Sequence, residues 1–209
     1  YDIGGIDQPD DISNFDGGEY DCVVHLAAFA GIRASIDNPE LFWNNNVEKA
    51  EPVFNFCRQT KTRLLFASSS SIYEWWLNPY SVTKKVNETQ APSNSVAMRF
   101  FTVYAEDSRA DMLYDMLKKN KATYLTDHYR DWIHVLDVCQ AIEILINNDF
   151  IGSIDIGTGE PTSVELLGKH MGRGHLEVIR NGKKNEMQET CADTTHLKSL
   201  GWIQTKKIM

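Results

Sequence analysis

The chain has 209 residues, 42% of them hydrophobic and 24% charged, which is the balance of a globular protein with one domain or a tightly joined pair. Its 21 basic and 29 acidic residues give a net charge of −8, and this argues against general binding to nucleic acid or to an anionic membrane surface. No apolar run approaches the roughly 18 residues of a transmembrane helix. The four cysteines show no CxxC spacing, so they predict buried free thiols in a reducing cytoplasm and no disulfide or metal site.

Short apolar runs alternate with helical patterns along the chain. In order, the patterns predict a strand over 21–28, a helix over 40–58, a strand over 63–67 that leads into four serines, a helix over 80–90, a strand over 95–101, helices over 111–120 and 134–148, and a strand over 152–156. Strands that alternate with helices predict a parallel sheet covered on both faces. In such sheets, ligands bind outside the carboxyl ends of the strands.

Tyr80 and Lys84 form the sharpest local pattern. Positions four apart share one face of a helix, so the phenol and the ammonium are expected side by side. A neighbouring ammonium favours the phenolate and lowers the pKa of a tyrosine, which makes a general base. By itself this spacing favours an ordinary surface helix. The Asn78-Pro79 helix start and the serine run upstream shift the interpretation toward an active site.

Several short motifs then follow one another in a fixed order across nearly the whole chain. They are Val24-His-Leu-Ala-Ala28, Asn46-Val47, Phe66-Ala-Ser-Ser-Ser-Ser-Ile-Tyr73, Asn78-Pro-Tyr-Ser-Val-Thr-Lys84, Arg99-Phe-Phe-Thr-Val-Tyr104, Arg130-Asp-Trp-Ile-His134 and Asp155-Ile-Gly-Thr-Gly159. Together they resemble the extended short-chain dehydrogenase/reductase superfamily, in particular its NAD-dependent epimerases and dehydratases of nucleotide sugars. The resemblance implies an α/β fold with a Rossmann-like doubly wound parallel sheet, and NAD as the cofactor.

The resemblance also implies roles for individual residues. The catalytic residues would be Ser69, Tyr80 and Lys84. The cofactor contacts would be Asp2, Ile3, Leu26, Ala27, Ala28, Asn46, Ser68, Tyr80, Lys84 and Phe100.

Two stretches look most like the UDP-glucuronate 4-epimerases, namely Ala30–Pro39 and Arg99–Met112. In that subfamily a threonine and, seven residues later, an arginine lie where the uronate carboxylate binds, and Thr102 and Arg109 have this spacing. A guanidinium can form two parallel hydrogen bonds with a carboxylate, and a hydroxyl adds a further donor, so both residue types suit a uronate carboxylate. An ordinary exposed loop arginine is the alternative for Arg109.

The resemblance implies two further substrate contacts, at Ser70 and at Arg130. Arg130 matches the position where relatives hold the substrate diphosphate. The alternative for Arg130 is a structural ion pair with Asp131. Family dehydratases carry an acidic pair for elimination where this chain has Ser70 and Ser71. The resemblance therefore favours epimerisation or simple oxidation over elimination.

The family's glycine-rich motif for the cofactor pyrophosphate does not occur in this sequence. We therefore expect a chain that lacks the first βαβ segment, with about 50 to 60 residues of a usual Rossmann half lying before Tyr1. Residues 1–104 and 131–158 are expected to form a partial NAD-binding domain. Residues 105–130 and 159–209 are expected to form a small, mainly C-terminal substrate-binding region.

The favoured function is NAD-dependent 4-epimerisation of a UDP-uronic acid through a 4-keto intermediate. The alternatives are a UDP-glucose/UDP-galactose 4-epimerase, a UDP-uronate decarboxylase, and a non-catalytic relative that binds sugar nucleotides. The partners expected are the UDP-sugar substrate and a second copy of the chain. Relatives dimerise through two helices, here 39–58 and 79–90, which carry apolar residues beyond one inner face, including Phe42, Trp43 and Val86.

Overall fold

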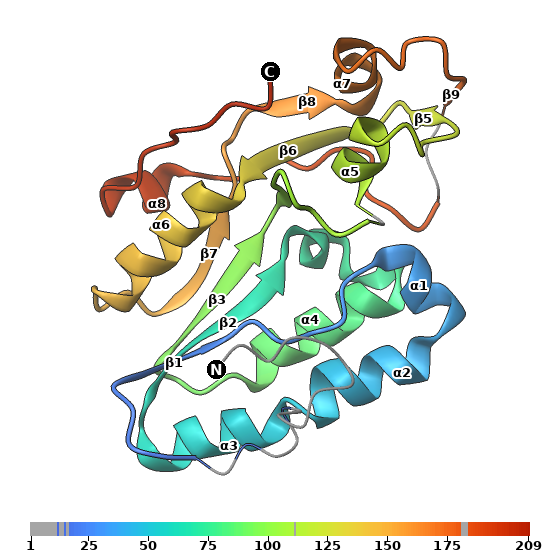
Figure 1. Ribbon diagram of the computed structural model, residues 1–209. Helices are drawn as coiled ribbons and strands as arrows, with labels where there is room; N and C mark the ends of the chain where they lie inside the picture. Colours follow the sequence, from blue (N-terminus) through green and yellow to red (C-terminus); the bar gives the residue numbers. More distant parts are fainter. Residues whose placement is uncertain (1–11, 13–14, 16, 111, 181–183) are drawn as a thin grey trace. The chain divides into compact units, whose positions relative to one another are not determined.

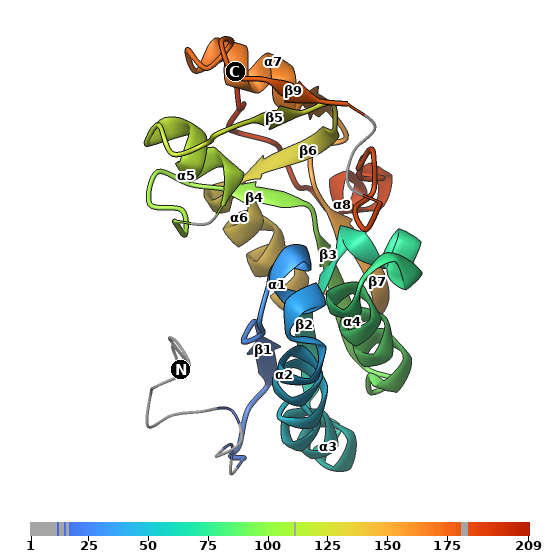
Figure 2. The same ribbon diagram turned by 90° about the vertical axis from the view of Figure 1, so that its right-hand side faces the viewer.

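The structure is a computed structural model that describes residues 12, 15, 17–110, 112–180 and 184–209. The chain divides into two compact units (Figures 1 and 2). The first contains the described residues of Tyr1–Arg99 with Leu145–Ile154, and the second those of Phe100–Ile144 with Asp155–Met209.

The first unit is built on a four-stranded sheet in the order β1-β2-β3-β7. Its strands are β1 (Cys22–His25), β2 (Arg63–Ser69), β3 (Ser95–Phe100) and β7 (Gly152–Ile156), and its helices are α1 (Ile32–Asp37), α2 (Pro39–Trp43), α3 (Glu51–Thr60) and α4 (Pro79–Gln90). β1 runs parallel to β2, with Cys22 opposite Arg63 and His25 opposite Phe66. The predicted Rossmann-like α/β class with a parallel sheet is confirmed, and the chain returns from strand to strand through helices (Figure 1).

The prediction of one helix over 40–58 is wrong, because the segment breaks into three. α2 ends at Trp43, residues Asn44–Glu48 form a π-helical turn, and α3 begins at Glu51. The cause is Pro52, which has no N–H for the carbonyl of Glu48 and whose ring crowds that carbonyl. Before Pro52 the helix adopts the wider π-helical geometry, in which the Lys49 N–H donates to the carbonyl of Asn44, five residues back.

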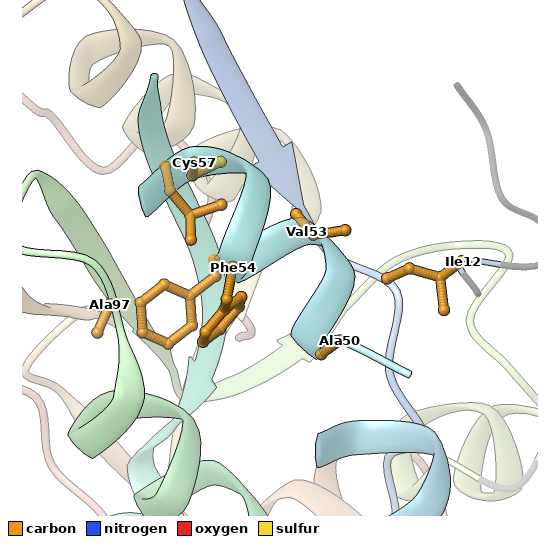
Figure 3. Close-up of a cluster of buried hydrophobic side chains, with 8 residues drawn as sticks. Ile12, Ala50, Val53, Phe54, Cys57 and Ala97 are labelled. Carbon is orange, nitrogen blue, oxygen red and sulfur yellow. The ribbon is translucent and has the colours of Figure 1, made fainter. Parts of the chain in front are cut away.

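α3 packs its inner face onto the sheet in an apolar core of the first unit (Figure 3). The buried members of this cluster are Ile12, Ala50, Val53, Phe54, Cys57, Leu64, Phe66 and Ala97. Phe54 and Phe66 contact each other with ring centroids 5.3 Å apart, and burying one such side chain contributes about 1.5–3 kcal/mol. This core fixes β2, and with it the serines at the carboxyl end of β2.

The second unit contains two small sheets. β4 (Thr102–Tyr104), β6 (Tyr129–His134) and β8 (Pro161–Ser163) form one, and β5 (Leu125–Thr126) and β9 (Val178–Ile179) form the other. Its helices are α5 (Leu113–Lys118), α6 (Val135–Ile146), α7 (Val164–His170) and α8 (Thr195–Ser199). Its core gathers Tyr104, Leu117, Leu125, Trp132, Val164 and Leu167.

Two buried carboxylates tie later segments to β6 and α6. Asp131 accepts hydrogen bonds from the backbone N–H groups of Thr158, Gly159 and Ala192, at 2.7–2.9 Å. Asp137 accepts from the N–H groups of Thr205 and Lys206, each at 3.0 Å. Both carboxylates are therefore satisfied by donors that lie far along the chain.

The prediction that all four cysteines are buried is wrong for three of them. Cys57 is buried in the core, Cys22 is half-buried, and Cys139 and Cys191 are exposed. All four are free thiols in this structure. Within the described residues, no helix is long and apolar enough to cross a membrane.

Candidate active site

The start of α4 is held by two side chains that cap its first turn. Asn78, the N-cap, accepts hydrogen bonds from the N–H of Ser81 at 2.9 Å and from its hydroxyl at 2.8 Å. Pro79 has no N–H to satisfy. The N–H of Tyr80 donates to the hydroxyl of Ser35 in α1, at 3.1 Å. Two of the N–H groups that a helix leaves without a partner are thereby bonded, and the backbone of Tyr80 is fixed.

The ring of Tyr80 is half-buried, and its neighbours orient it. It packs edge-on against Phe42 of α2, with centroids 6.3 Å apart and planes at 85°. The Nζ atom of Lys84 lies over the ring, 5.8 Å from its centroid. The structure therefore brings the predicted pair Tyr80 and Lys84 together on one helix face. It also shows Phe42 to be buried, so the expectation that Phe42 lies beyond the inner face is wrong.

Lys84 is 2% exposed, and its ammonium donates to the backbone carbonyl of Ala67 at 2.8 Å. That bond ties α4 to β2 two residues before Ser69. An ammonium has three hydrogens to donate, and among the described residues no second acceptor is bonded to this one. A buried ammonium with donors to spare fits a ligand rich in hydroxyl oxygens, as the ribose of a dinucleotide is.

Burial also sets the charge of the groups around this ammonium. Burial lowers the pKa of Lys84 from 10.5 to about 8. His25, at the end of β1, has its pKa lowered to about 3, first by burial and second by the charge of Lys84. At neutral pH the imidazole is therefore neutral, and Lys84 remains mostly charged.

We expect Lys84→Met to stabilise the protein at pH 7 by about 1–3 kcal/mol. Each unit of pKa depression costs about 1.4 kcal/mol while the folded lysine is charged, and loss of the Ala67 hydrogen bond offsets part of the gain. Between pH 8 and 10.5 the unfolded chain binds more protons, so wild-type stability rises there and the gain disappears. Urea unfolding at pH 7 and 10.5 measures both. A variant less stable than wild type at pH 7 contradicts the prediction.

The four serines at the end of β2 and the start of the following segment are buried. The hydroxyl of Ser69 accepts from the N–H and from the hydroxyl of Ser71, at 3.2 and 3.0 Å, and so caps the short 3₁₀ segment Ser70–Leu77. Ser68 donates its hydroxyl to Glu88 of α4 at 2.5 Å. Ser70 is also buried.

The side chain of Asn46 is engaged by the protein. Its amide oxygen accepts from the N–H of Phe29 at 2.7 Å, and its amide nitrogen donates to the carbonyl of Phe29 and to the hydroxyl of Thr83. Thr83 in turn donates to the carbonyl of Tyr80 at 2.7 Å. Asn46, predicted to contact the cofactor, thus links the segment after β1 to α4.

The remaining predicted cofactor contacts lie in three places. Leu26, Ala27 and Ala28 follow β1, where Leu26 is 49% exposed. Phe100 ends β3 and is half-buried. Asp2 and Ile3 lie outside the described residues.

The predicted substrate contacts Thr102, Arg109 and Arg130 lie in the second unit. Thr102 begins β4, opposite Trp132 and two residues along β6 from Arg130. Arg109 is exposed, in the loop before α5, where its guanidinium lies 3.7 Å from the sulfur of Met112. Arg130 forms an ion pair with Glu186, at 3.6 Å, and donates to the carbonyls of Tyr129 and Gln188 at 2.9 and 3.3 Å.

The sequence reasoning did not find three residues that support the site, namely Ser35, Glu88 and Arg99. Each acts through a contact between distant segments, as in the bond from Tyr80 to Ser35, 45 residues away. The one available signal was spacing, because Glu88 follows Lys84 by one helical turn. The described residues hold no group of three or more His, Cys, Asp or Glu able to bind a metal ion.

Comparisons with known proteins identify the family of the chain. The model of the NAD dependent epimerase/dehydratase family matches residues 3–157. An uncharacterized protein of Methanocaldococcus jannaschii is 27% identical over 93% of this chain and 70% of its own length. The UDP-glucuronate 4-epimerase of Thermodesulfobacterium geofontis is 26% identical over 85% of this chain and 65% of its own.

Among solved structures, MoeE5 in complex with UDP-glucuronic acid and NAD superposes with a TM-score of 0.76 at 27% identity, over 90% of this chain and 75% of MoeE5. The chain spans between 28% and 68% of the length of six further curated relatives.

Proposed function

This chain belongs to the NAD dependent epimerase/dehydratase family, and we propose that it interconverts UDP-glucuronate and UDP-galacturonate through a 4-keto intermediate. The observation that carries the proposal is the buried Lys84 ammonium beside the ring of Tyr80, fixed to the strand that leads to Ser69. This is the arrangement of an acid/base catalyst with a cation that stabilises its charged form.

In the proposed mechanism, Tyr80 removes the proton from the sugar 4-hydroxyl and later returns it. Lys84 favours the phenolate form, and Ser69 orients the hydroxyl and shares its proton. NAD, when bound, supplies reversible hydride acceptance at sugar C4. Because the hydride returns to the sugar, no external redox partner is needed.

We propose that the residues around the carboxyl ends of β1 and β2 hold the cofactor. The spare donors of Lys84 fit the nicotinamide ribose. Leu26, Ala27 and Ala28 offer an apolar wall for the dinucleotide. The short side chains of the two alanines leave room for it to approach the backbone. Asp2 and Ile3 would contact its adenosine half.

For the substrate, we propose that Thr102 and Arg109 bind the uronate carboxylate, that Arg130 binds the diphosphate and that Ser70 contacts the sugar. The name of the T. geofontis relative and the ligand of MoeE5 support a UDP-uronic acid. MoeE5 is also solved with UDP-glucose, so a neutral UDP-hexose is the second candidate. Ser70 and Ser71, where an elimination would need acidic residues, support epimerisation over dehydration.

The direct test is NMR of UDP-glucuronate incubated with the protein and NAD. We expect the signals of UDP-galacturonate to grow until the two sugars reach equilibrium. Conversion of UDP-glucose alone would favour the neutral-hexose epimerase, and release of carbon dioxide would favour the decarboxylase. If tight binding without conversion is found, the chain is a binding protein.

We also propose that the protein is a cytoplasmic homodimer that pairs through 39–58 and 79–90. A groove of about 210 Å³ lies between α3 and α4 and is lined by Val47, Glu51, Phe54, Arg58, Asn87 and Gln90. Leu41 and Trp43 of α2 are 53% and 41% exposed. Acidic Glu51 and basic Arg58 in one groove suit a two-fold interface, in which each would face the other's counterpart.

Light scattering at tens of micromolar is expected to give twice the mass of the chain. Trp43→Glu, which places a charge in the proposed interface, is expected to shift the population to monomer. Ile203→Glu is the matched control, because Ile203 is 68% exposed in the second unit. A wild type that is monomeric at these concentrations contradicts the proposal.

A further inference from the structure

A network of polar side chains lies behind the catalytic residues in the first unit. Its centre is Glu88 of α4, one helical turn after Lys84 and two turns after Tyr80, so that the three side chains share a face of the helix. Glu88 accepts from two nitrogens of the Arg99 guanidinium: Nε donates to one carboxylate oxygen at 3.0 Å and Nη2 donates to the other at 2.8 Å. The two side chains are only 10% and 20% exposed.

Two further contacts extend this pair to the serine segment. Ser68 donates its hydroxyl to the same carboxylate at 2.5 Å, and Ser69 follows it directly. Arg99 donates from Nη1 to the hydroxyl of Tyr73 at 3.2 Å, and its guanidinium lies 5.2 Å from the Tyr73 ring centroid. One ion pair therefore joins α4, β2, β3 and the 3₁₀ segment that carries Tyr73.

We propose that Glu88 and Arg99 are positioning residues, whose forked ion pair holds the carboxyl end of β2, and hence Ser69, against the helix that carries Tyr80 and Lys84. The inference rests on the proposed function for the roles of Ser69 and Tyr80. The pair touches neither substrate nor cofactor in this assignment.

The geometry explains why these two residue types are needed. A forked pair restrains direction as well as distance, since two parallel hydrogen bonds resist rotation of either side chain. The third donor, Ser68, fills a remaining lone pair of the carboxylate, so the position of the strand end is coupled to the pair. The bond from Lys84 to Ala67 restrains the same strand, but it does so before Ser68 and from a single point.

The Arg99 guanidinium also compensates the charge of the Glu88 carboxylate, which is only 10% exposed. Without Arg99, the Glu88 carboxylate would stand uncompensated one turn from the buried ammonium. The other groups that face this ammonium are the neutral imidazole of His25 from β1 and the phenol of Tyr80. Loss of Arg99 would therefore disturb the site by releasing the strand and by leaving the Glu88 carboxylate without its cation.

The test compares Glu88→Gln and Arg99→Lys, which keep much of the size of each side chain but remove the forked ion pair. We expect kcat for UDP-glucuronate to fall by about 10- to 100-fold, since a small misplacement of reacting groups costs this much. KM is expected to change by less than about threefold, because no substrate contact is lost.

The matched control is Arg63→Met. Arg63 lies at the opposite end of β2 and holds the carbonyls of Leu145 and Phe150, at 3.0 and 2.8 Å. This variant is expected to lower the melting temperature comparably without lowering kcat at 25 °C. If Arg63→Met lowers kcat as much as Arg99→Lys does, the effect is general destabilisation and the proposal is overturned.

Amide hydrogen exchange of the protein without cofactor gives a readout that needs no turnover. In Glu88→Gln and Arg99→Lys, protection over 67–73 is expected to fall by about tenfold or more, whereas Arg63→Met is expected to leave it unchanged. Unchanged protection in the two variants overturns the proposal. A wild type that converts no UDP-sugar removes the proposed function instead, and the exchange measurement then still decides whether the pair holds the strand end.

Discussion

Tyr80→Phe is expected to lower kcat by a factor of about 10² to 10⁴, the usual contribution of a positioned acid/base group. The substitution removes only the phenolic oxygen. The edge-on contact with Phe42 and the bond from the Tyr80 N–H to Ser35 are both kept, so the melting temperature is expected to stay close to that of wild type. Steady-state turnover of UDP-glucuronate and a thermal unfolding curve measure the two effects.

Tyr129→Phe is the control for this variant, because Tyr129 is a 46% exposed tyrosine of β6. It is expected to leave turnover unchanged. Near-native turnover of purified Tyr80→Phe would remove Tyr80 from the mechanism, and the pairing of its ring with Lys84 would then have only a structural meaning.

Arg109→Ala is expected to lower kcat/KM for UDP-glucuronate by roughly 10- to 150-fold. A charge-assisted bond to the uronate carboxylate contributes about 1.5–3 kcal/mol, and each 1.4 kcal/mol is a factor of ten. UDP-glucose has no carboxylate, so its kcat/KM is expected to change little. The exposed position of Arg109 before α5 leaves the guanidinium accessible to a ligand, and its removal is not expected to destabilise the core.

Arg130→Ala separates the two substrate contacts. Both UDP-sugars carry the same diphosphate, so both are expected to bind this variant more weakly and by similar factors. The uronate assignment would be contradicted if Arg109→Ala lowered kcat/KM equally for the two substrates. It would also be contradicted if the wild type preferred UDP-glucose. Thr102 would then be assigned most simply to the uridine or ribose.

The sequence predicts those parts of the fold that depend on local pattern. The strand over 63–67 and the helix over 80–90 follow from an apolar run and from the Asn78-Pro79 cap, and both exist with nearly these bounds. The strand β6 (Tyr129–His134) was not predicted as a strand, although its residues were recognised as a motif. The alternation of polar and apolar residues expected of a strand is interrupted at Asp131, which is buried beside apolar neighbours. Its carboxylate accepts hydrogen bonds from residues 27 to 61 positions away.

The same division applies to the candidate site. Tyr80 and Lys84 are neighbours by helical spacing, so their contact could be expected from the sequence. Glu88 shares this spacing, but its partners Ser68 and Arg99 lie on β2 and β3. No local pattern in the sequence indicates that either of them bonds Glu88. Ser35 lies in a stretch that was recognised only for its likeness to a subfamily. Its bond to Tyr80 depends on how α1 meets α4.

The two buried carboxylates Asp131 and Asp137 limit how the chain can be trimmed for expression. A fragment ending before Thr190 would lose the Ala192 donor to Asp131 and both backbone donors to Asp137, leaving buried negative charge that costs several kcal/mol to retain unsatisfied. It would also lose Trp202, which is 2% exposed and bonds the carbonyl of Asp137. Recombinant fragments of this protein should therefore keep the chain through Lys206, even where only the residues around Tyr80 are under study.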